Sequence, residues 1–252
     1  MSNHTYFISD LHLQEDDQAT HGLFENWVKA NAKQADAVYI LGDLFEFWAG
    51  DDDNTPYHQR VVALLRKLTQ AGVAVYFMPG NRDFLIGERF LKETGLQALP
   101  DPTVVTLHKT RVLLSHGDAF CTEDVSHQRF RSLSQHKISK KIFLSLPLRL
   151  RKKIAKKIRT KSQIHAKNKT MAVMDVTNSA ILKALRHYKV SKIIHGHTHQ
   201  ANRHLIDQKD GKTAERIVLG DWYQRSSFLS INDSGHYALT NTPVKKRLAN
   251  QP

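Results

Sequence analysis

Five short segments of this sequence end an apolar run with side chains that can bind a metal ion or a phosphate. They are, in chain order, Asp10-Leu11-His12, Gly42-Asp43, Gly80-Asn81-Arg82-Asp83, His116-Gly117-Asp118 and His195-Gly196-His197-Thr198-His199. A single segment of this kind is most often a turn, because Asp, Asn and Gly favour turns. A buried aspartate after an apolar run needs a partner, and one pair of cations would supply a partner to all five segments. We therefore expect them to meet at one site.

The apolar patterns of the chain predict the elements that position these residues. Strands are expected at 5–9, 37–41 and 73–78, and helices at 22–35, 61–68 and 84–91. This βαβαβ order predicts a largely parallel sheet. Open sheets of this type place their sites at the carboxyl ends of the strands, where the first three segments stand.

The second half of the chain mixes strands and helices. A hairpin is expected from 104–107 and 112–114, a helix at 181–187, a strand at 192–194, and an antiparallel set from 217–219 and 228–231. Between the hairpin and the last helix, an insert from about 122 to 174 predicts helices interrupted at Pro147.

The composition is that of one globular domain. The chain has 252 residues, of which 40% are hydrophobic and 24% charged, so disorder and a bare coiled coil are excluded. No apolar run approaches the roughly 18 residues of a membrane span, and the N-terminus has no signal-like segment, so we expect a protein that stays in the cytosol. Cys121 is the only cysteine, which excludes an intrachain disulfide.

The positive charge of the chain comes from the insert. Lys and Arg number 37 against 24 Asp and Glu, a formal net charge of +13, and residues 125–174 hold fifteen of the basic residues and no acidic one. Within the insert, Leu150, Ile154 and Ile158 fall four residues apart among Lys and Arg, a basic amphipathic pattern. A solvated helix is one interpretation, but the charge imbalance favours an anionic partner such as lipid headgroups, a phosphate ester or nucleic acid.

The five segments together resemble the signature of the calcineurin-like metallophosphoesterase family: D-x-H, G-D, G-N-H-D/E, a later H, and G-H-x-H. The resemblance covers the whole catalytic body. It implies an α/β fold, a four-layer α/β/β/α sandwich of two mixed sheets. It also implies one domain over 1–252, with a helical cap inserted at about 122–174.

The same resemblance implies the metal ligands. One ion would be held by Asp10, His12, Asp43 and His199, and the other by Asp43, Asn81, His116 and His197, with Asp43 as the bridge. Carboxylate, amide and imidazole ligands suit Mn²⁺, Fe²⁺ or Zn²⁺, and we expect two divalent ions per chain, with Mn²⁺ favoured. Two such ions can clamp a phosphate and activate water, so the expected reaction is in-line phosphoester hydrolysis.

Arg82 departs from the family signature, which has a histidine after G-N. A guanidinium cannot protonate a leaving alkoxide, although it can neutralise phosphate oxygens. A substrate whose leaving group is itself a phosphate needs no such acid, so Arg82 favours cleavage of a diphosphate bond. Another histidine could still supply a proton, and that alternative stays open.

A narrower resemblance is to the UDP-2,3-diacylglucosamine diphosphatases of lipid A synthesis. It rests on Gly42-Asp-Leu-Phe-Glu-Phe-Trp48, Gly80-Asn-Arg-Asp-Phe84, His116-Gly-Asp118, Cys121-Thr-Glu-Asp124, Met174-Asp-Val176 and His195-Gly-His-Thr-His199. The resemblance implies water attack on the α-phosphorus, giving UMP and 2,3-diacylglucosamine 1-phosphate. It implies catalytic roles for Asn81, Arg82 and His197, and substrate contacts by Asn81, Arg82, Asp124, Ser162, Lys169 and His197. The family has an asparagine where this chain has Ala166, which puts that contact in doubt.

The expected partners are therefore a UDP-linked diacylated glucosamine lipid and an anionic membrane surface. The chain is expected to be a monomer, peripheral to the cytoplasmic face of the inner membrane. Apolar residues of the insert, including Ile138, Ile142 and Leu150, could line a trough for acyl chains or simply pack. The alternatives are a nuclease or nucleotide phosphodiesterase on the same scaffold and a binding scaffold without activity. The insert holds only two aromatic residues for base stacking, so no nucleic-acid partner is expected. No ligand is missing, which disfavours the silent scaffold.

Overall fold

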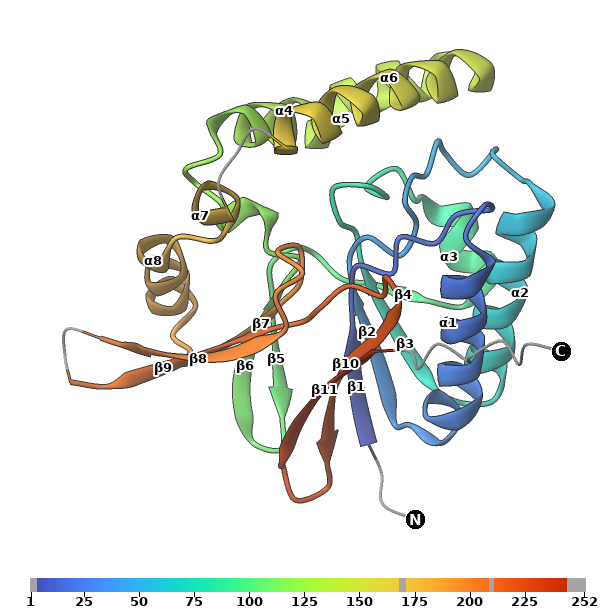
Figure 1. Ribbon diagram of the computed structural model, residues 1–252. Coiled ribbons are helices and arrows are strands. Elements are labelled where there is room, and N and C mark those ends of the chain that lie inside the picture. Colours follow the sequence, from blue (N-terminus) through green and yellow to red (C-terminus); the bar gives the residue numbers. More distant parts are fainter. Residues whose placement is uncertain (1–3, 168–170, 209–210, 244–252) are drawn as a thin grey trace, which may run out of the picture.

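The computed structural model describes residues 4–167, 171–208 and 211–243 and contains two β-sheets (Figure 1). In spatial order, the first sheet consists of β11 (Tyr237–Pro243), β10 (Arg225–Asn232), β1 (His4–Ile8), β2 (Ala37–Leu41), β3 (Ala74–Met78) and β4 (Gln97–Ala98). The second consists of β5 (Thr103–Leu107), β6 (Thr110–Ser115), β7 (Lys192–His195), β9 (Thr213–Val218) and β8 (Asn202–Asp207). Both sheets contain parallel and antiparallel pairs, so both are mixed, as expected.

Side-chain alternation along the central strands builds three layers of packing. In β1, Tyr6 and Ile8 pack toward the helices of the first sheet, whereas Phe7 packs against the second sheet. Val38 and Ile40 of β2 repeat the pattern on the helix side. Since successive strand residues point to opposite faces, an unbroken apolar strand belongs between two layers.

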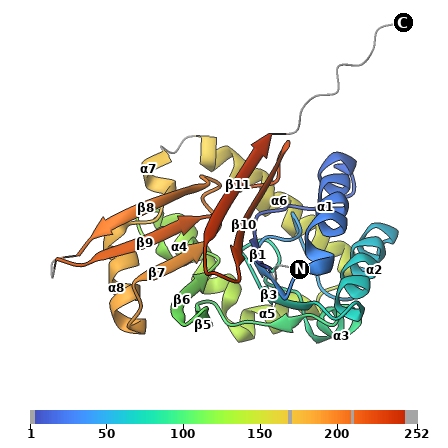
Figure 2. The ribbon, with the colours of Figure 1, turned by 90° about the horizontal axis from the view of Figure 1, so that it is seen from below.

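Helices cover both outer faces. The first sheet is covered by α1 (Gln18–Ala30), α2 (Pro56–Gln70) and α3 (Glu88–Thr94), and the second by α8 (Asn178–Tyr188). Figure 2 shows the strands of both sheets between α8 on one side and α1 to α3 on the other. The four-layer α/β/β/α sandwich is confirmed.

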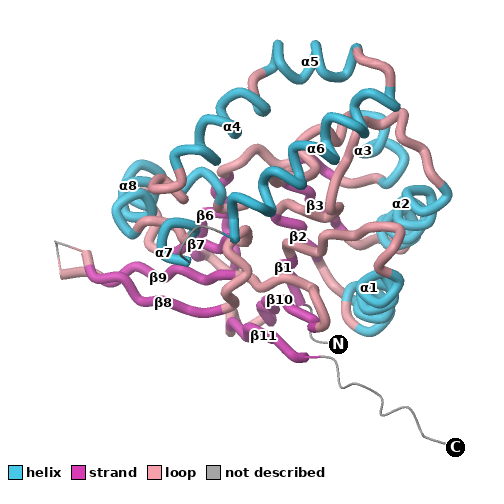
Figure 3. The backbone as a smooth tube through the Cα atoms, turned by 45° about the horizontal axis from the view of Figure 1, so that its top comes forward, coloured by secondary structure: helices cyan, strands magenta, loops and turns pink. Residues whose placement is uncertain are grey.

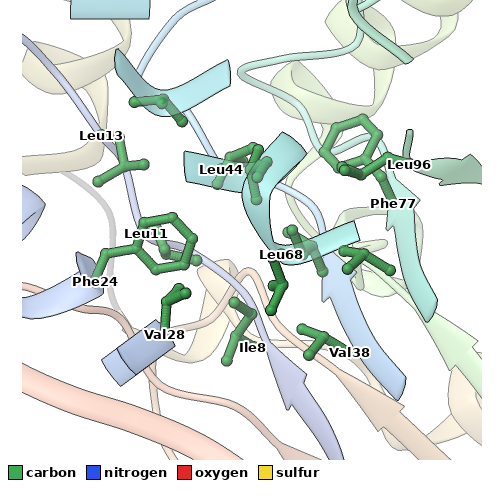
Figure 4. Packing of buried hydrophobic residues seen from close by; sticks show 14 of the residues in the cluster. Ile8, Leu11, Leu13, Phe24, Val28, Val38, Leu44, Leu68, Phe77 and Leu96 are labelled. Carbon is green, nitrogen blue, oxygen red and sulfur yellow. The ribbon is translucent and has the colours of Figure 1, made fainter. Parts of the chain in front are cut away.

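The core beneath α1 and α2 holds the amino half of the fold together (Figure 4). Phe24 and Val28 of α1 lie over Ile8, and Leu68 of α2 lies near Val38. Each such buried aliphatic or aromatic side chain contributes about 1.5–3 kcal/mol of hydrophobic free energy. This packing fixes the strands whose ends carry the polar segments.

The parallel order of β1, β2 and β3 is confirmed, but three expectations need correction. The strand at 217–219 pairs in parallel with β7 in the second sheet, whereas 228–231 belongs to β10 in the first sheet, so they form no antiparallel set. Helix α1 begins at Gln18 because the side chain of Asp17 caps it, accepting a hydrogen bond from the Thr20 amide. Helix α3 begins only at Glu88.

The basic insert folds into helices over the carboxyl ends of the strands. These are α4 (Val125–Gln135), α5 (Lys137–Ser145) and α6 (Leu148–Lys167), and together we refer to them as the cap; the short α7 (Met171–Met174) follows. Figure 3 shows α4 and α5 along an arch and α6 returning across the loops that follow β1, β2 and β3. The expected break at Pro147 is confirmed, since it separates α5 from α6. Among the described residues, no helix is both long enough and apolar enough to cross a bilayer.

Candidate metal centre

The ends of five strands meet beneath the cap. Asp10 and His12 follow β1, Asp43 follows β2, Asn81 follows β3, His116 follows β6, and His197 and His199 follow β7. We refer to these seven residues as the strand-end cluster. Because β6 and β7 belong to the second sheet, the cluster lies where the two sheets approach each other.

One half of the cluster contains Asp10, His12 and His199, with Asp43 beside them. Nε2 of His12 lies 3.3 Å from Nε2 of His199 and 3.9 Å from both Asp10 Oδ1 and Asp43 Oδ2. Nε2 of His199 lies 3.4 Å from Asp10 Oδ1. Donor atoms of Asp10, His12 and His199 thus converge within the span that one bound cation would bridge, and Asp43 Oδ2 lies beside His12.

The other half contains Asp43, Asn81 and His116. Nε2 of His116 lies 3.0 Å from Asn81 Oδ1 and 3.8 Å from Asp43 Oδ1. Asp43 therefore directs one oxygen toward each half, the arrangement expected of a bridging carboxylate. The ring of His197 lies edge-on to that of His116, with 5.1 Å between centroids. The structure thus brings all seven predicted ligands together, His197 at the margin.

Five of the seven cluster residues have a left-handed backbone, with φ between 50° and 69°. They are Asp10, His12, Asp43, His197 and His199. This conformation costs a residue other than glycine about 1–2 kcal/mol, and it persists where the surrounding structure imposes it, commonly at functional sites. Gly80 allows the loops to approach so closely, since a Cβ there would collide with the carboxylate of Asp43.

Three of the imidazoles are held through Nδ1, which leaves Nε2 facing the cluster. Nδ1 of His12 lies 2.8 Å from Glu46 Oε2, that of His199 lies 3.3 Å from Asp221 Oδ2, and that of His116 lies 3.0 Å from the Leu41 carbonyl oxygen. An acceptor at Nδ1 fixes the tautomer whose Nε2 lone pair can bind a metal ion.

Glu46 and Asp221 were missed from the sequence. Asp221 had a signal, because Leu219-Gly220-Asp221 repeats the pattern of Leu41-Gly42-Asp43. Glu46 lies inside the Gly42–Trp48 segment, but nothing in the spacing indicates which side chain it contacts.

A bound cation fits this donor set, as the oxygen Oδ1 of Asp10 shows. The other oxygen, Oδ2, accepts hydrogen bonds from Ser9 Oγ at 2.6 Å and from the His197 amide at 2.9 Å. Oδ1 is buried and accepts no hydrogen bond from any described residue. A buried carboxylate oxygen left without a donor is costly, and a cation between Asp10, His12 and His199 would satisfy it.

The pKa values of the cluster histidines also indicate a site that favours positive charge. Burial lowers the pKa of His116, but Asp43, Asp10 and Asp118 outweigh it and raise the pKa to about 9. Burial also lowers the pKa of His199, but Asp10 and Asp221 outweigh it and raise the pKa to about 10. Burial and the neighbouring His116 lower the pKa of His197 well below its usual value, which keeps the ring neutral. The surrounding carboxylates thus favour positive charge at His116 and His199.

Arg82 lies at the rim of the cluster and contacts Glu46. Its NH1 is 3.9 Å from Glu46 Oε1, and its side chain is 28% exposed, so the guanidinium can reach a ligand. Burial raises the pKa of Glu46, but His12, Arg82 and Arg159 outweigh it and lower the pKa below its usual value. The backbone amide of Arg82 donates to Asp43 Oδ1 at 2.8 Å, which ties the loop after β3 to the bridging carboxylate.

Asp83 fastens two loops rather than facing the cluster. Its carboxylate accepts hydrogen bonds from the amides of Leu44 at 2.7 Å and Gly80 at 2.8 Å. Burial and the charge of Asp43 raise the pKa of Asp83 to about 7. Asp83 therefore holds the backbone that carries Asp43 and Asn81.

On the cap side of the cluster, Asp118 receives a hydrogen bond from Arg131 Nε at 2.9 Å and lies 3.6 Å from His127 Nε2. His127 also lies against His197, with 5.2 Å between ring centroids. No motif spacing indicates a role for His127, because its neighbours on α4 are not site residues.

The predicted substrate contacts on the cap are described only in part. Asp124 lies at the start of α4 and caps the helix, accepting a hydrogen bond from the His127 amide at 3.0 Å. Lys169 lies outside the described residues, and so do the side chains of Ser162 and Ala166. These contacts stay predictions.

Comparison with known proteins agrees with the geometry. The family model described as calcineurin-like phosphoesterase matches residues 4–201. A protein of Haemophilus influenzae named UDP-2,3-diacylglucosamine hydrolase is 46% identical over 93% of this chain and 97% of its own length. Proteins of the same name from Vibrio cholerae and Photorhabdus laumondii are 41% identical over 96% of the chain and 44% over 91%, and the matches cover 98% and 95% of those relatives.

The family match spans β1 through β7 and includes every residue of the strand-end cluster. The curated relatives extend the similarity through the cap and into the last strands. The chain therefore belongs to the calcineurin-like phosphoesterase family and, within it, to the group of the UDP-2,3-diacylglucosamine hydrolases.

Proposed function

We propose that this protein hydrolyses the diphosphate bond of UDP-2,3-diacylglucosamine, giving UMP and 2,3-diacylglucosamine 1-phosphate. The observation that carries the proposal is the 46% identity over 93% of the chain to a relative of that name. The intact strand-end cluster supports catalysis, because a scaffold without activity would not need to bury these ligands at a backbone cost.

The residues that would hold divalent cations divide into two sets that share Asp43. Asp10, His12 and His199 complete one set, and Asn81, His116 and His197 complete the other. Carboxylate, amide and imidazole donors favour Mn²⁺ in this proposal, with two ions per chain. When bound, such ions neutralise phosphate charge and promote attack by water on phosphorus.

Arg82 supplies the protein's own positive charge at the reacting phosphates. Its Nε is buried and has no partner among the described residues, and a guanidinium can donate two parallel hydrogen bonds to phosphate oxygens. Attack at the α-phosphorus expels a sugar phosphate, which leaves as a stable anion without a proton. Arg82 can therefore stand where relatives in the wider family have a histidine.

The cap would meet the lipid. Ile138 and Ile142 of α5 are 63% and 62% exposed, and Leu133 of α4 is 67% exposed. Exposed lysines lie on α5 and on the neighbouring α6, including Lys137, Lys141, Lys153, Lys156 and Lys157. Apolar side chains next to basic ones are typical of a surface that binds anionic lipid, so we place the protein at the cytoplasmic face of the inner membrane.

The test is direct hydrolysis. Protein loaded with Mn²⁺ is incubated with detergent-dispersed UDP-2,3-diacylglucosamine, and UMP is measured by chromatography. We expect UMP in stoichiometric balance with the diacylated sugar phosphate, and none from the Asp43→Ala variant. Absence of UMP from the wild type, together with cleavage of a nucleic-acid diester, would overturn the proposal in favour of a nuclease.

A further inference from the structure

Glu46 is a cluster neighbour that contacts both the catalytic body and the cap. It follows β2 by five residues, and its side chain is 13% exposed. Oε2 lies 2.8 Å from Nδ1 of His12, and Oε1 lies 2.9 Å from Nε of Arg159 and 3.9 Å from NH1 of Arg82. One carboxylate therefore faces three cationic or hydrogen-donating groups from separate parts of the chain.

The three groups come from three separate segments of the chain. His12 follows β1, Arg82 follows β3, and Arg159 belongs to α6 of the cap. Glu46 itself is fixed by its backbone, since its amide donates to the Leu13 carbonyl oxygen at 3.1 Å and its neighbour Phe45 forms a bridge with Leu13. These contacts hold the backbone of Glu46 in place beside His12.

Arg159 extends this connection into the cap. Its side chain is 37% exposed, and its NH2 lies 3.4 Å from Oε1 of Gln14, one residue beyond Leu13. Removing the charge of Glu46 would leave all three groups without their shared carboxylate, whereas removing Arg159 would free only the cap side. The two substitutions therefore have different expected consequences.

We propose that Glu46 is a positioning residue that sets the metal ligand His12 and the phosphate-facing Arg82 while it holds helix α6 through Arg159. Docking of the cap and the geometry of the site then depend on the same carboxylate. The part that concerns Arg82 rests on the proposed function. The parts that concern His12 and α6 do not, and the test uses them.

The test compares Glu46→Gln, Arg159→Gln and the double variant by two measurements that need no substrate. Mn²⁺ affinity is measured by calorimetry, and amide hydrogen exchange is measured over residues 153–160 of α6. We expect Glu46→Gln to weaken Mn²⁺ binding about tenfold, the lower end for loss of a group that orients a metal-binding histidine. We expect Arg159→Gln to leave Mn²⁺ affinity within about twofold, and each variant to accelerate exchange in α6.

The double variant tests whether the two side chains act as one unit. Exchange in α6 should be no faster in the double variant than in the faster single variant, because both remove the same contact. Glu25→Gln is the matched control, since Glu25 also lies beside a histidine, with 3.3 Å between its Oε1 and His21 Nε2, but on the exposed face of α1. That variant should change neither measurement.

Two results would overturn the proposal. Unchanged Mn²⁺ affinity in Glu46→Gln would show that Glu46 does not set His12. Additive acceleration of exchange in the double variant would show that Glu46 and Arg159 act separately on α6. Arg159 lies on a half-exposed helix face, so Arg159→Gln keeps the fold and leaves the exchange measurement usable even if Glu46→Gln folds poorly.

Discussion

The strand-end cluster and the cap both carry many polar side chains, but they are held in place differently. Asp10 and His116 of the cluster are completely buried, and backbone hydrogen bonds tie their loops to neighbouring ones, while Asp83 links the loops of Asp43 and Asn81. Helices α4 and α5 of the cap contain no buried residue. The cap is attached through polar contacts of its basic side chains, such as that of Lys140 with the Phe84 carbonyl oxygen at 3.0 Å, and through the partly buried Phe143.

This difference indicates that the strand-end cluster and the cap have different roles in the reaction. Left-handed backbone at Asp10 and His12 persists only because the two sheets and their packed cores impose it. A helix with few buried contacts opens at a lower free energy than a core strand, and such elements admit large ligands. We infer that the geometry of the reaction is set in the two-sheet body and access of the substrate in the cap.

The largest effect is expected for Asp43→Ala. It removes the carboxylate that faces both halves of the cluster and also the acceptor of the Arg82 amide. We expect UMP release to fall by at least about a thousandfold, since both cation sites lose a ligand. Circular dichroism should show a folded protein.

The matched control for that variant is Asp36→Ala, at the exposed amino end of the same strand. It should retain the activity of the wild type. Activity near normal in Asp43→Ala would remove the main reason to place the chemistry in the body.

Arg82→His should have the next largest effect. It restores the residue of the wider family signature but replaces a permanent cation by a neutral ring. We expect hydrolysis of UDP-2,3-diacylglucosamine to fall about a hundredfold, comparable to loss of one donor that stabilises transition-state charge. The steady-state rate of Arg82→Lys should lie between those of the wild type and Arg82→His, because lysine keeps the charge but lacks the planar guanidinium that can donate two parallel hydrogen bonds. A His variant as fast as the wild type would contradict the leaving-group argument.

Much of the fold could be predicted because the central strands leave little choice. Runs such as Ala37–Leu41 are apolar at every position, and only a strand between two layers buries both faces. The edge strands were harder: β8 contains exposed polar residues, and Leu205 within it is 77% exposed. Its place depends on pairing with β9, which no local pattern encodes.

The residues of the site likewise divide into those that local sequence patterns predict and those that they do not. Asp10, Asp43 and His116 could be predicted because they directly follow apolar strands, where buried polar side chains demand a partner. Glu46 and His127 could not, since their roles arise from contacts with residues far away in sequence. Long-range side-chain contacts leave no local spacing for sequence analysis to detect.

Arg151→Ala tests how firmly the cap is attached. Arg151 is 2% exposed and donates hydrogen bonds to the carbonyl oxygens of Ala49 and Leu146 and to Asp52. Loss of these partly buried contacts should lower the opening free energy of α6 by about 2 kcal/mol, measured by amide hydrogen exchange. The Michaelis constant should rise about tenfold with kcat nearly unchanged, since the cluster is intact.

The control for that variant is Arg149→Ala, whose side chain is exposed two residues earlier on the same helix. It should leave exchange in α6 unchanged. If Arg151→Ala lowers kcat as strongly as Arg82→His, the cap takes part in the chemistry and the division between the two regions fails.

The smallest effect on hydrolysis is expected from replacing Lys153, Lys156 and Lys157 by Gln. These side chains are exposed on α6, whereas the neighbouring Lys152 pairs with Asp53 and is left in place. Each basic residue near an anionic bilayer contributes up to about 1 kcal/mol, and the attraction decays over roughly 8 Å at physiological salt. Sedimentation with vesicles that contain anionic lipid should therefore weaken about tenfold. Hydrolysis of detergent-dispersed substrate should stay near the wild-type rate, because Arg82 and the cluster are untouched. Vesicle binding that survives both the substitutions and high salt would show that the exposed Ile138 and Ile142, rather than charge, hold the cap at the membrane.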